Sequence, residues 1–189
     1  MRIRTLAALT SVAIAISVAP ADAAWKSYVV KDLGFSFMAP GDVKAELGTS
    51  RGDVAGPRQT IVFKSAEDNI EYKVTVVSFT QAQADGAILL GEREFTFRQR
   101  KDVVSDVFSQ VGGGKDTVYG NKIVVDLPDK KGRMAGAFYF TNGKLYALEA
   151  TIPANGNNAS PDPGRFVDSI KFGSSAEPGA VALQVPQVE

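Results

Sequence analysis

The stretch that decides the fold is "AFYFTNGKLYALEATI", residues Ala137–Ile152. Two apolar runs flank the dipeptide Asn142-Gly143, which is typical of a two-residue turn because both turn positions need a positive φ. A two-residue turn fixes the pairing of its strands, so Tyr139 is predicted to face Tyr146. The sequence therefore predicts a β-hairpin of defined register.

Both faces of this hairpin are apolar. Side chains alternate between the faces of a strand, which puts Phe138, Phe140, Leu145 and Ala147 on one face and Ala137, Tyr139, Tyr146 and Leu148 on the other. A sheet with one solvated face would instead alternate apolar and polar residues. We therefore expect the hairpin to lie in the middle of a sheet that is covered on both sides.

The first predicted cover is a long central helix. Its apolar stripe has helical spacing and consists of Leu90, Phe97, Val104, Phe108 and Val111. The glycines at 112–114 would end it. The β-branched pair at 103–104 and the glycine at 91 are unfavourable for one continuous helix, and the alternative is a strand at 103–111.

The second predicted cover is a short C-terminal helix in "PDPGRFVDSIKFG", residues 161–173. Asp162 is the expected N-cap and Pro163 suits the first turn. Strands are expected at 25–30, 33–40, 58–65, 70–79 and 116–127. The predicted fold class is therefore α+β: a mainly antiparallel sheet between a long central helix and a short C-terminal helix, an α/β/α sandwich.

The N-terminus has the features of a cleaved export signal. Arg2 and Arg4 precede an uncharged, largely apolar run at Leu6–Ala19, and small residues follow at Ala21–Ala23. The run is shorter than the roughly 20 residues of a membrane-spanning helix. We expect cleavage after Ala23 and a periplasmic or secreted protein without an integral membrane segment.

The predicted domain organisation has three parts. Residues 1–23 are the cleaved signal peptide, 24–173 form a single domain, and 174–189 form a flexible C-terminal tail. Removing Arg2, Arg4 and Asp22 with the signal leaves 19 basic and 20 acidic side chains. This balance gives no electrostatic reason to bind nucleic acid.

The composition removes several kinds of chemistry. The chain has no histidine and no cysteine, which excludes Ser-His-Asp and Cys-His catalysis as well as thiolate metal sites. No catalytic residue, cofactor site or metal site is predicted. Carboxylate chemistry remains open, and the acidic pairs close in sequence are Glu92/Glu94, Asp102/Asp106 and Asp126/Asp129.

Three aromatic residues are candidates for an interaction surface. Trp25 lies at the start of the expected mature chain, where tryptophan either clamps the terminus or anchors a partner. Tyr139 and Tyr146 either pack as a cross-strand pair in the core or line a groove.

The order of these elements resembles the α/β/α sandwich of the PsbP-like family. The opening "DLGFSFMAPGDV" (Asp32–Val43) and the closing "RFVDSIKF" (Arg165–Phe172) are similar to the ends of such domains. The resemblance spans residues 25–173 and transfers no site residue. The charged N-terminal arm of the plant proteins has no counterpart here.

The resemblance implies an exported accessory module that binds a larger assembly. We therefore expect a non-enzymatic protein that binds an envelope protein and is a monomer or a weak oligomer. One alternative is a carrier that holds a small apolar ligand between sheet and long helix. The other is a carboxylate-dependent hydrolase.

Overall fold

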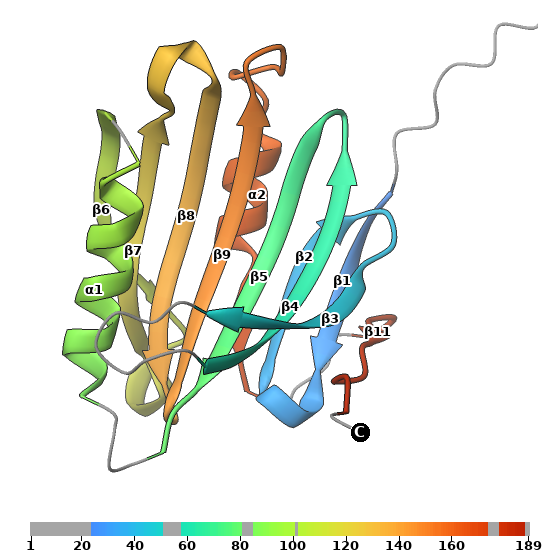
Figure 1. Cartoon of the computed structure of the whole chain (residues 1–189). Helices are drawn as coiled ribbons and strands as arrows, with labels where there is room; N and C mark the ends of the chain where they lie inside the picture. The colour runs from blue at the N-terminus through green and yellow to red at the C-terminus, as the bar shows by residue number, and fades with distance from the viewer. Residues whose placement is uncertain (1–23, 51–57, 81–84, 101, 174–177, 188–189) are drawn as a thin grey trace, which may run out of the picture.

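A seven-stranded antiparallel sheet forms the centre of the molecule (Figure 1). The computed structural model describes residues 24–50, 58–80, 85–100, 102–173 and 178–187. The strand order is β3-β4-β5-β9-β8-β7-β6. In chain order these strands are β3 (Lys44–Ser50), β4 (Arg58–Glu67), β5 (Ile70–Ser78), β6 (Asp102–Val111), β7 (Val118–Asp126), β8 (Gly132–Thr141) and β9 (Lys144–Pro153).

The predicted hairpin is confirmed as β8 and β9. Tyr139 pairs with Tyr146 and Thr141 with Lys144, as the two-residue turn requires. Asn142 and Gly143 have φ of 51° and 69°, the positive values that such a turn needs. The hairpin lies inside the sheet, with β5 on one side and β7 on the other.

The predicted long central helix is wrong, and so is the predicted α/β/α sandwich built on it. The described residues form mostly β-sheet, in two sheets of seven and four strands, with two short α-helices. The helix α1 covers only Gly86–Arg98, and residues 102–111 form strand β6. β6 pairs along its length with β7. Val104 and Phe108, assigned to a buried helical stripe, are 50% and 70% exposed. The β-branched residues of this segment prefer the extended conformation, and β7 supplies the partner strand.

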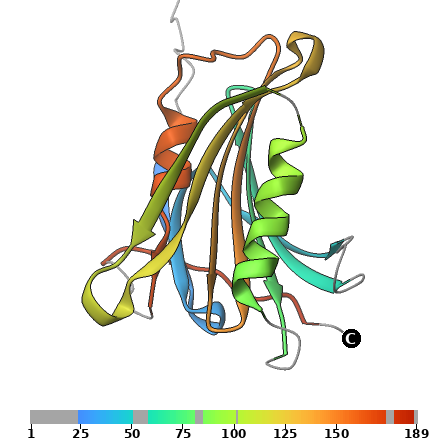
Figure 2. The ribbon, with the colours of Figure 1, turned by 90° about the vertical axis from the view of Figure 1, so that its left-hand side faces the viewer.

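One face of the large sheet, here called the α1 face, is covered by α1 (Figure 2). The buried Phe97 of α1 packs edge-on against Phe138 of β8, with ring centroids 5.0 Å apart. Ile123 and Val125 of β7 complete this smaller core. The Asp85 side chain caps the helix by accepting hydrogen bonds from two backbone N–H groups of its first turn.

The opposite face, here called the α2 face, is covered by a helix and a second sheet. The helix α2 is short, Asp162–Asp168, and Pro161 takes the N-cap position expected for Asp162. The second sheet has the order β10-β2-β1-β11. Its strands are β1 (Trp25–Val30), β2 (Phe35–Pro40), β10 (Lys171–Phe172) and β11 (Val181–Ala182). Short 3-10 turns lie at η1 (Lys31–Leu33), η3 (Gly114–Asp116) and η4 (Pro128–Lys130).

The larger core lies between this second layer and the α2 face. Phe35 and Phe37 of β2 enter it from the small sheet, and Phe166 enters from α2. The Tyr146 hydroxyl donates a hydrogen bond to the Leu33 carbonyl at 2.8 Å, which joins the two sheets. Both faces of the hairpin are therefore dry, as the sequence predicts.

The described part of the C-terminal segment returns to the body of the protein. β11, which lies within the segment predicted as a tail, runs parallel to β1. The predicted leader at 1–23 lies outside the described residues, and the division into leader, domain and tail stays a prediction. Within the described ranges, no helix has the length and apolarity needed to cross a bilayer.

Candidate interaction surface at the β6 edge

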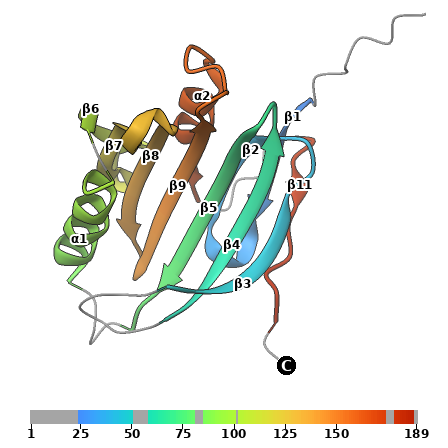
Figure 3. The ribbon, with the colours of Figure 1, turned by 45° about the horizontal axis from the view of Figure 1, so that its top comes forward.

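Strand β6 forms one outer edge of the large sheet (Figure 3). Within the described residues it pairs with β7 on one side, and its other side has no strand. Natural edge strands are usually protected by charged side chains, above all lysine, by proline, by a bulge or by shortness. Of these, β6 has a bulge between Val103 and Ser105 and two aspartates, all within its first half. β6 is ten residues long and its sequence, "DVVSDVFSQV", contains neither lysine nor proline. An edge of this kind is a template for pairing with another strand.

Large apolar side chains gather around this edge and are exposed. The rings of Phe108 and Tyr119 stack with centroids 5.6 Å apart, and Tyr119 is 57% exposed. We define the β6-edge surface as Val103, Val104, Val107, Phe108 and Tyr119. Clustered exposed apolar residues of this kind mark interaction sites in soluble proteins.

The two faces of β6 offer different side chains. Phe108 lies opposite Asn121 of β7 on the α1 face, whereas Val107 lies opposite Lys122 on the α2 face. The register shifts at a bulge between Val103 and Ser105. A strand added to this edge would therefore contact aromatic rings on one face and smaller side chains on the other.

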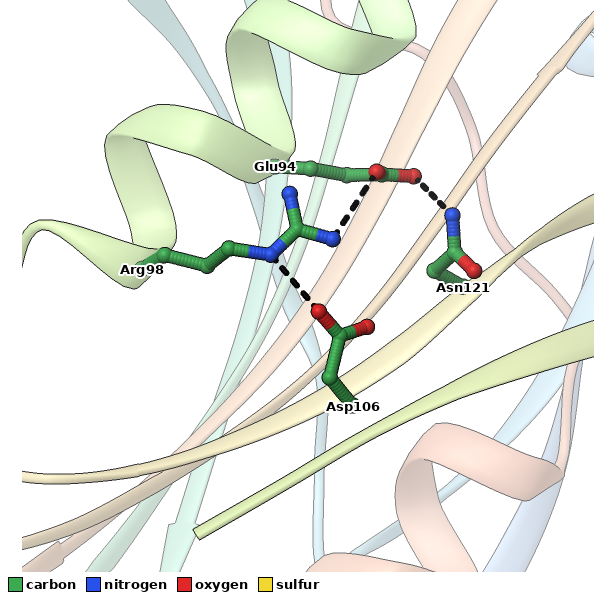
Figure 4. A network of polar contacts seen from close by, with 4 residues as sticks. All are labelled: Glu94, Arg98, Asp106 and Asn121. Atoms are coloured by element: carbon green, nitrogen blue, oxygen red, sulfur yellow. Dashed lines mark hydrogen bonds and ion pairs between the residues drawn. The ribbon is translucent and has the colours of Figure 1, made fainter. Parts of the chain in front are cut away.

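A polar network fastens β6 to α1 on the α1 face (Figure 4). The Arg98 guanidinium donates to the Asp106 carboxylate of β6 at 2.7 Å and to the Glu94 carboxylate at 3.3 Å. The Asn121 amide of β7 donates to the other oxygen of Glu94 at 2.7 Å. The hydrogen bond with Asp106, with burial opposing it, raises the pKa of Arg98. Helix and edge strands are thus held together as one unit.

A buried hydrogen bond fastens β6 on the α2 face. The hydroxyls of Ser109 and Tyr139 lie 2.9 Å apart, and both side chains are buried. Burial raises the pKa of Tyr139, and the Ser109 hydrogen bond acts in the opposite direction. The neutral phenol is therefore the stable form. Its hydrogen bond with Ser109 anchors β6 on the α2 face, opposite Phe108.

A cavity of about 320 Å³ lies between α2 and the outer strands on the α2 face. Apolar residues from the sheet and α2 line it, including Val124, Ala135, Ile152 and Val167, and Ser105 and Val107 of β6 line it from the edge. An ion pair between Lys122 and Asp168, 2.6 Å long, lies among its lining residues.

A second ion pair borders the same cavity. The Arg133 guanidinium donates to both carboxylate oxygens of Asp126, at 2.7 and 3.2 Å. This hydrogen bonding holds the pKa of Asp126 below its usual value. The charges beside the cavity are therefore paired within the protein, and its interior is mainly apolar.

A buried carboxylate also lies under α1. Glu149 of β9 is 1% exposed and forms ion pairs with Lys73 at 2.9 Å, Arg93 at 2.8 Å and Arg100 at 3.1 Å. Burial raises the pKa of Glu149, but the nearby cations outweigh it and hold the pKa below its usual value. The cluster joins α1 to the sheet and keeps the helix beside the β6-edge surface.

In each acidic pair considered for hydrolysis, the two carboxylates either lie apart from each other or take part in ion pairs with basic residues. Asp102 and Asp106 lie on strand β6 and not on one helix face; they oppose Asp126 and Ile123, respectively. Glu94 shares the Arg98 guanidinium with Asp106. Among the described residues, no group of three histidine, cysteine, aspartate or glutamate side chains could hold a metal ion.

None of the three aromatic candidates is exposed at the β6 edge, although Tyr139 is hydrogen-bonded to Ser109 of β6 from within the core. Tyr139 and Tyr146 are buried in the larger core, at 0% and 1% exposure. Trp25 is half-buried: its ring packs edge-on against Tyr72, and the Arg165 guanidinium lies 4.3 Å above its centroid. None of the three belongs to the β6-edge surface, and a role of Trp25 as a partner anchor stays a prediction.

Sequence reasoning missed the β6 edge because it placed Val104 and Phe108 in a helix. The available signal was the strand alternative at 103–111. In the extended conformation, successive residues alternate between the two faces of the sheet. As a strand residue, Phe108 lies on the α1 face. Because α1 packs mainly on β7, β8 and β9, it leaves Phe108 exposed.

Comparison with models of protein families found no match, and comparison with curated proteins found none. Among solved structures, the chain is similar to the solution structure of cyanobacterial PsbP from Synechocystis sp. PCC 6803. The similarity has 12% sequence identity and a TM-score of 0.49, and it covers 87% of this chain and 98% of the other. The resemblance expected from the sequence is thereby confirmed as a likeness of fold alone. Function is argued below from this chain's own residues.

Proposed function

We propose that the protein is an exported, non-enzymatic binding module that takes up an extended segment of an envelope protein along β6. The observation that carries this proposal is the open edge of β6 with the exposed, stacked Phe108 and Tyr119 beside it. Backbone groups of an edge strand supply the hydrogen bonds of strand addition, and adjacent side chains supply selectivity.

The charges of the edge indicate what kind of segment fits. β6 carries two aspartates, Asp102 and Asp106, and no basic residue. A second copy of β6 paired with the first would add another Asp102, which has no ion-pair partner within the described residues, whereas Asp106 of each copy stays paired with Arg98. A partner segment with basic and apolar residues complements this edge, because opposite charges across paired strands stabilise and like charges destabilise.

The alternatives have less support from the site. The carboxylates considered for hydrolysis include Asp126, whose pKa is lowered by Arg133, whereas a general acid needs a raised pKa. The cavity lies between the sheet and α2, not beneath a long helix as the carrier hypothesis expects. Its position beside β6 suits a role in the same binding event.

Site-directed photo-crosslinking tests the proposal in the native envelope. A photoreactive phenylalanine analogue replaces Phe108, and the control places it at Leu47 on β3, the opposite edge of the sheet. We expect the Phe108 position to crosslink to one discrete segment of one envelope protein, containing apolar and basic residues. Equal crosslinking from both positions, or none above background from Phe108, would contradict the proposal.

A further inference from the structure

The cavity on the α2 face opens beside the strand that we propose as the docking edge. Ser105 and Val107 of β6 line the cavity, and in the register of the sheet they lie opposite Val124 and Lys122 of β7. A strand paired with β6 would direct every second side chain to this face. Those side chains would lie at the cavity's β6 border.

The lining of the cavity selects an apolar occupant. Ala135, Ile152 and Val167 are buried, at 6%, 2% and 5% exposure. The nearby cations are already paired, Lys122 with Asp168 and Arg133 with Asp126. Burying an apolar group here removes apolar surface from water without breaking an ion pair. A volume of about 320 Å³ is at the lower end of the range of ligand pockets.

We propose that this cavity takes one large apolar side chain of the partner segment, from the position opposite Ser105 or Val107, while a basic residue of that segment faces Asp102. The inference rests on the proposed function and adds the chemistry of the partner. The register places Asp102 opposite Asp126, whose charge is paired with Arg133. Within the described residues Asp102 has no ion-pair partner, so a basic side chain of the segment would complement it.

The charge of the edge commits the occupant to a segment of another protein. A second copy of β6 offers no basic residue to Asp102, and its own Asp102 would add to the negative charge of the edge, since Asp106 is paired with Arg98. A free apolar molecule would fill the cavity without using the β6 backbone. The test below separates a peptide segment from a free apolar molecule.

The experiment selects peptides from a random library displayed on phage, with the purified exported protein as target. Selected peptides and a set of small apolar compounds are assayed against wild type and three variants. Phe108→Ser disturbs the β6-edge surface and leaves the cavity intact. Val124→Phe fills the cavity from its floor. Val181→Phe makes the same change on β11, far from the cavity in sequence and in sheet order. Melting temperatures establish that each variant is folded.

We expect the peptides to share a large apolar residue at one position and a basic residue on the same face of the extended chain. Val124→Phe should lower the affinity of these peptides by at least about tenfold, the scale of burying one large apolar side chain. Val181→Phe should leave their affinity unchanged. If peptides depend on Phe108 but bind Val124→Phe as tightly as wild type, the anchor inference is wrong and the proposed function stands. If no peptide depends on Phe108, both are wrong. If small apolar compounds alone respond to Val124→Phe, the cavity is a ligand site and the inference is wrong.

If Val124→Phe does not fold, Ser105→Phe replaces it, because Ser105 borders the same cavity from β6. The same loss of peptide affinity, about tenfold, is expected for Ser105→Phe. Unchanged peptide binding would again overturn the inference.

Discussion

The Arg93 guanidinium of α1 lies 2.8 Å from the Glu149 carboxylate of β9, which is 1% exposed. Lys73 and Arg100 bind the same carboxylate. A buried carboxylate without partners would have a raised pKa, but these cations hold the pKa of Glu149 below its usual value. The ionised form is therefore part of the folded state, and the cluster connects α1 to the sheet.

Replacing Glu149 by glutamine should destabilise the protein by about 1.5–3 kcal/mol at neutral pH, because the partly exposed Lys73, Arg93 and Arg100 lose the charged acceptor that they share. Since the folded pKa is depressed, the stabilisation is present above the unfolded pKa, about 4.3, and is lost as the pH falls through the folded pKa. Urea unfolding across this range should show the difference between wild type and Glu149→Gln shrinking with acidity. The exposed Glu71→Gln is the control, and an equal effect from it would contradict the role of the cluster.

Removing the Tyr139 hydroxyl should loosen β6. Tyr139→Phe leaves the buried Ser109 hydroxyl without its partner, at a cost of about 1–3 kcal/mol. Amide hydrogen exchange in β6 should accelerate. The matched change at the exposed Tyr119 should have little effect on stability. Identical unfolding free energies for the two variants would show that the hydrogen bond does not hold the edge.

Two glycine substitutions should act in opposite directions. Gly91 of α1 has open space where a Cβ would go, so Gly91→Ala should stabilise the helix by about 0.5–1 kcal/mol. A Cβ on Gly120 of β7 would collide with the Phe138 carbonyl and the Tyr139 ring, so Gly120→Ala should destabilise by roughly 1–3 kcal/mol. Thermal unfolding measures both, and a stable Gly120→Ala would show that the sheet adjusts there.

The predicted signal peptide has a direct test. Mass spectrometry of the exported protein should give a chain that begins at Ala24, and Ala23→Arg should leave a longer precursor because the cleavage site needs small residues. A mature protein that retains residues 1–23 would refute cleavage and would reopen the membrane-anchor alternative.

The sequence predicted the parts of the fold that depend on local rules. The Asn142-Gly143 turn set the register of β8 and β9, and two apolar faces required two covers. The covers themselves depend on distant contacts. Val104 and Phe108 have helical spacing, but both lie in strand β6, where Phe108 pairs with Asn121 of β7 and Val104 lies at the bulge. The second cover includes β1 and β2, whose place beside α2 no local pattern indicated.

The interaction surface was less predictable for a related reason. Tyr139 and Tyr146 have the residue type of an interface, and burial in the larger core removes them from the surface. Phe108 and Tyr119 come from two strands, and their stacking depends on the register of β6 and β7. A surface of this kind becomes visible only when the sheet is assembled.

Amide hydrogen exchange of β6, measured residue by residue by NMR with and without a synthetic peptide of the crosslinked segment, tests strand addition most directly. The account predicts that the peptide slows exchange at alternate β6 residues, those whose N–H groups point away from β7, and leaves the opposite edge at β3 unchanged. Protection confined to β3, or binding without any protection in β6, would contradict it.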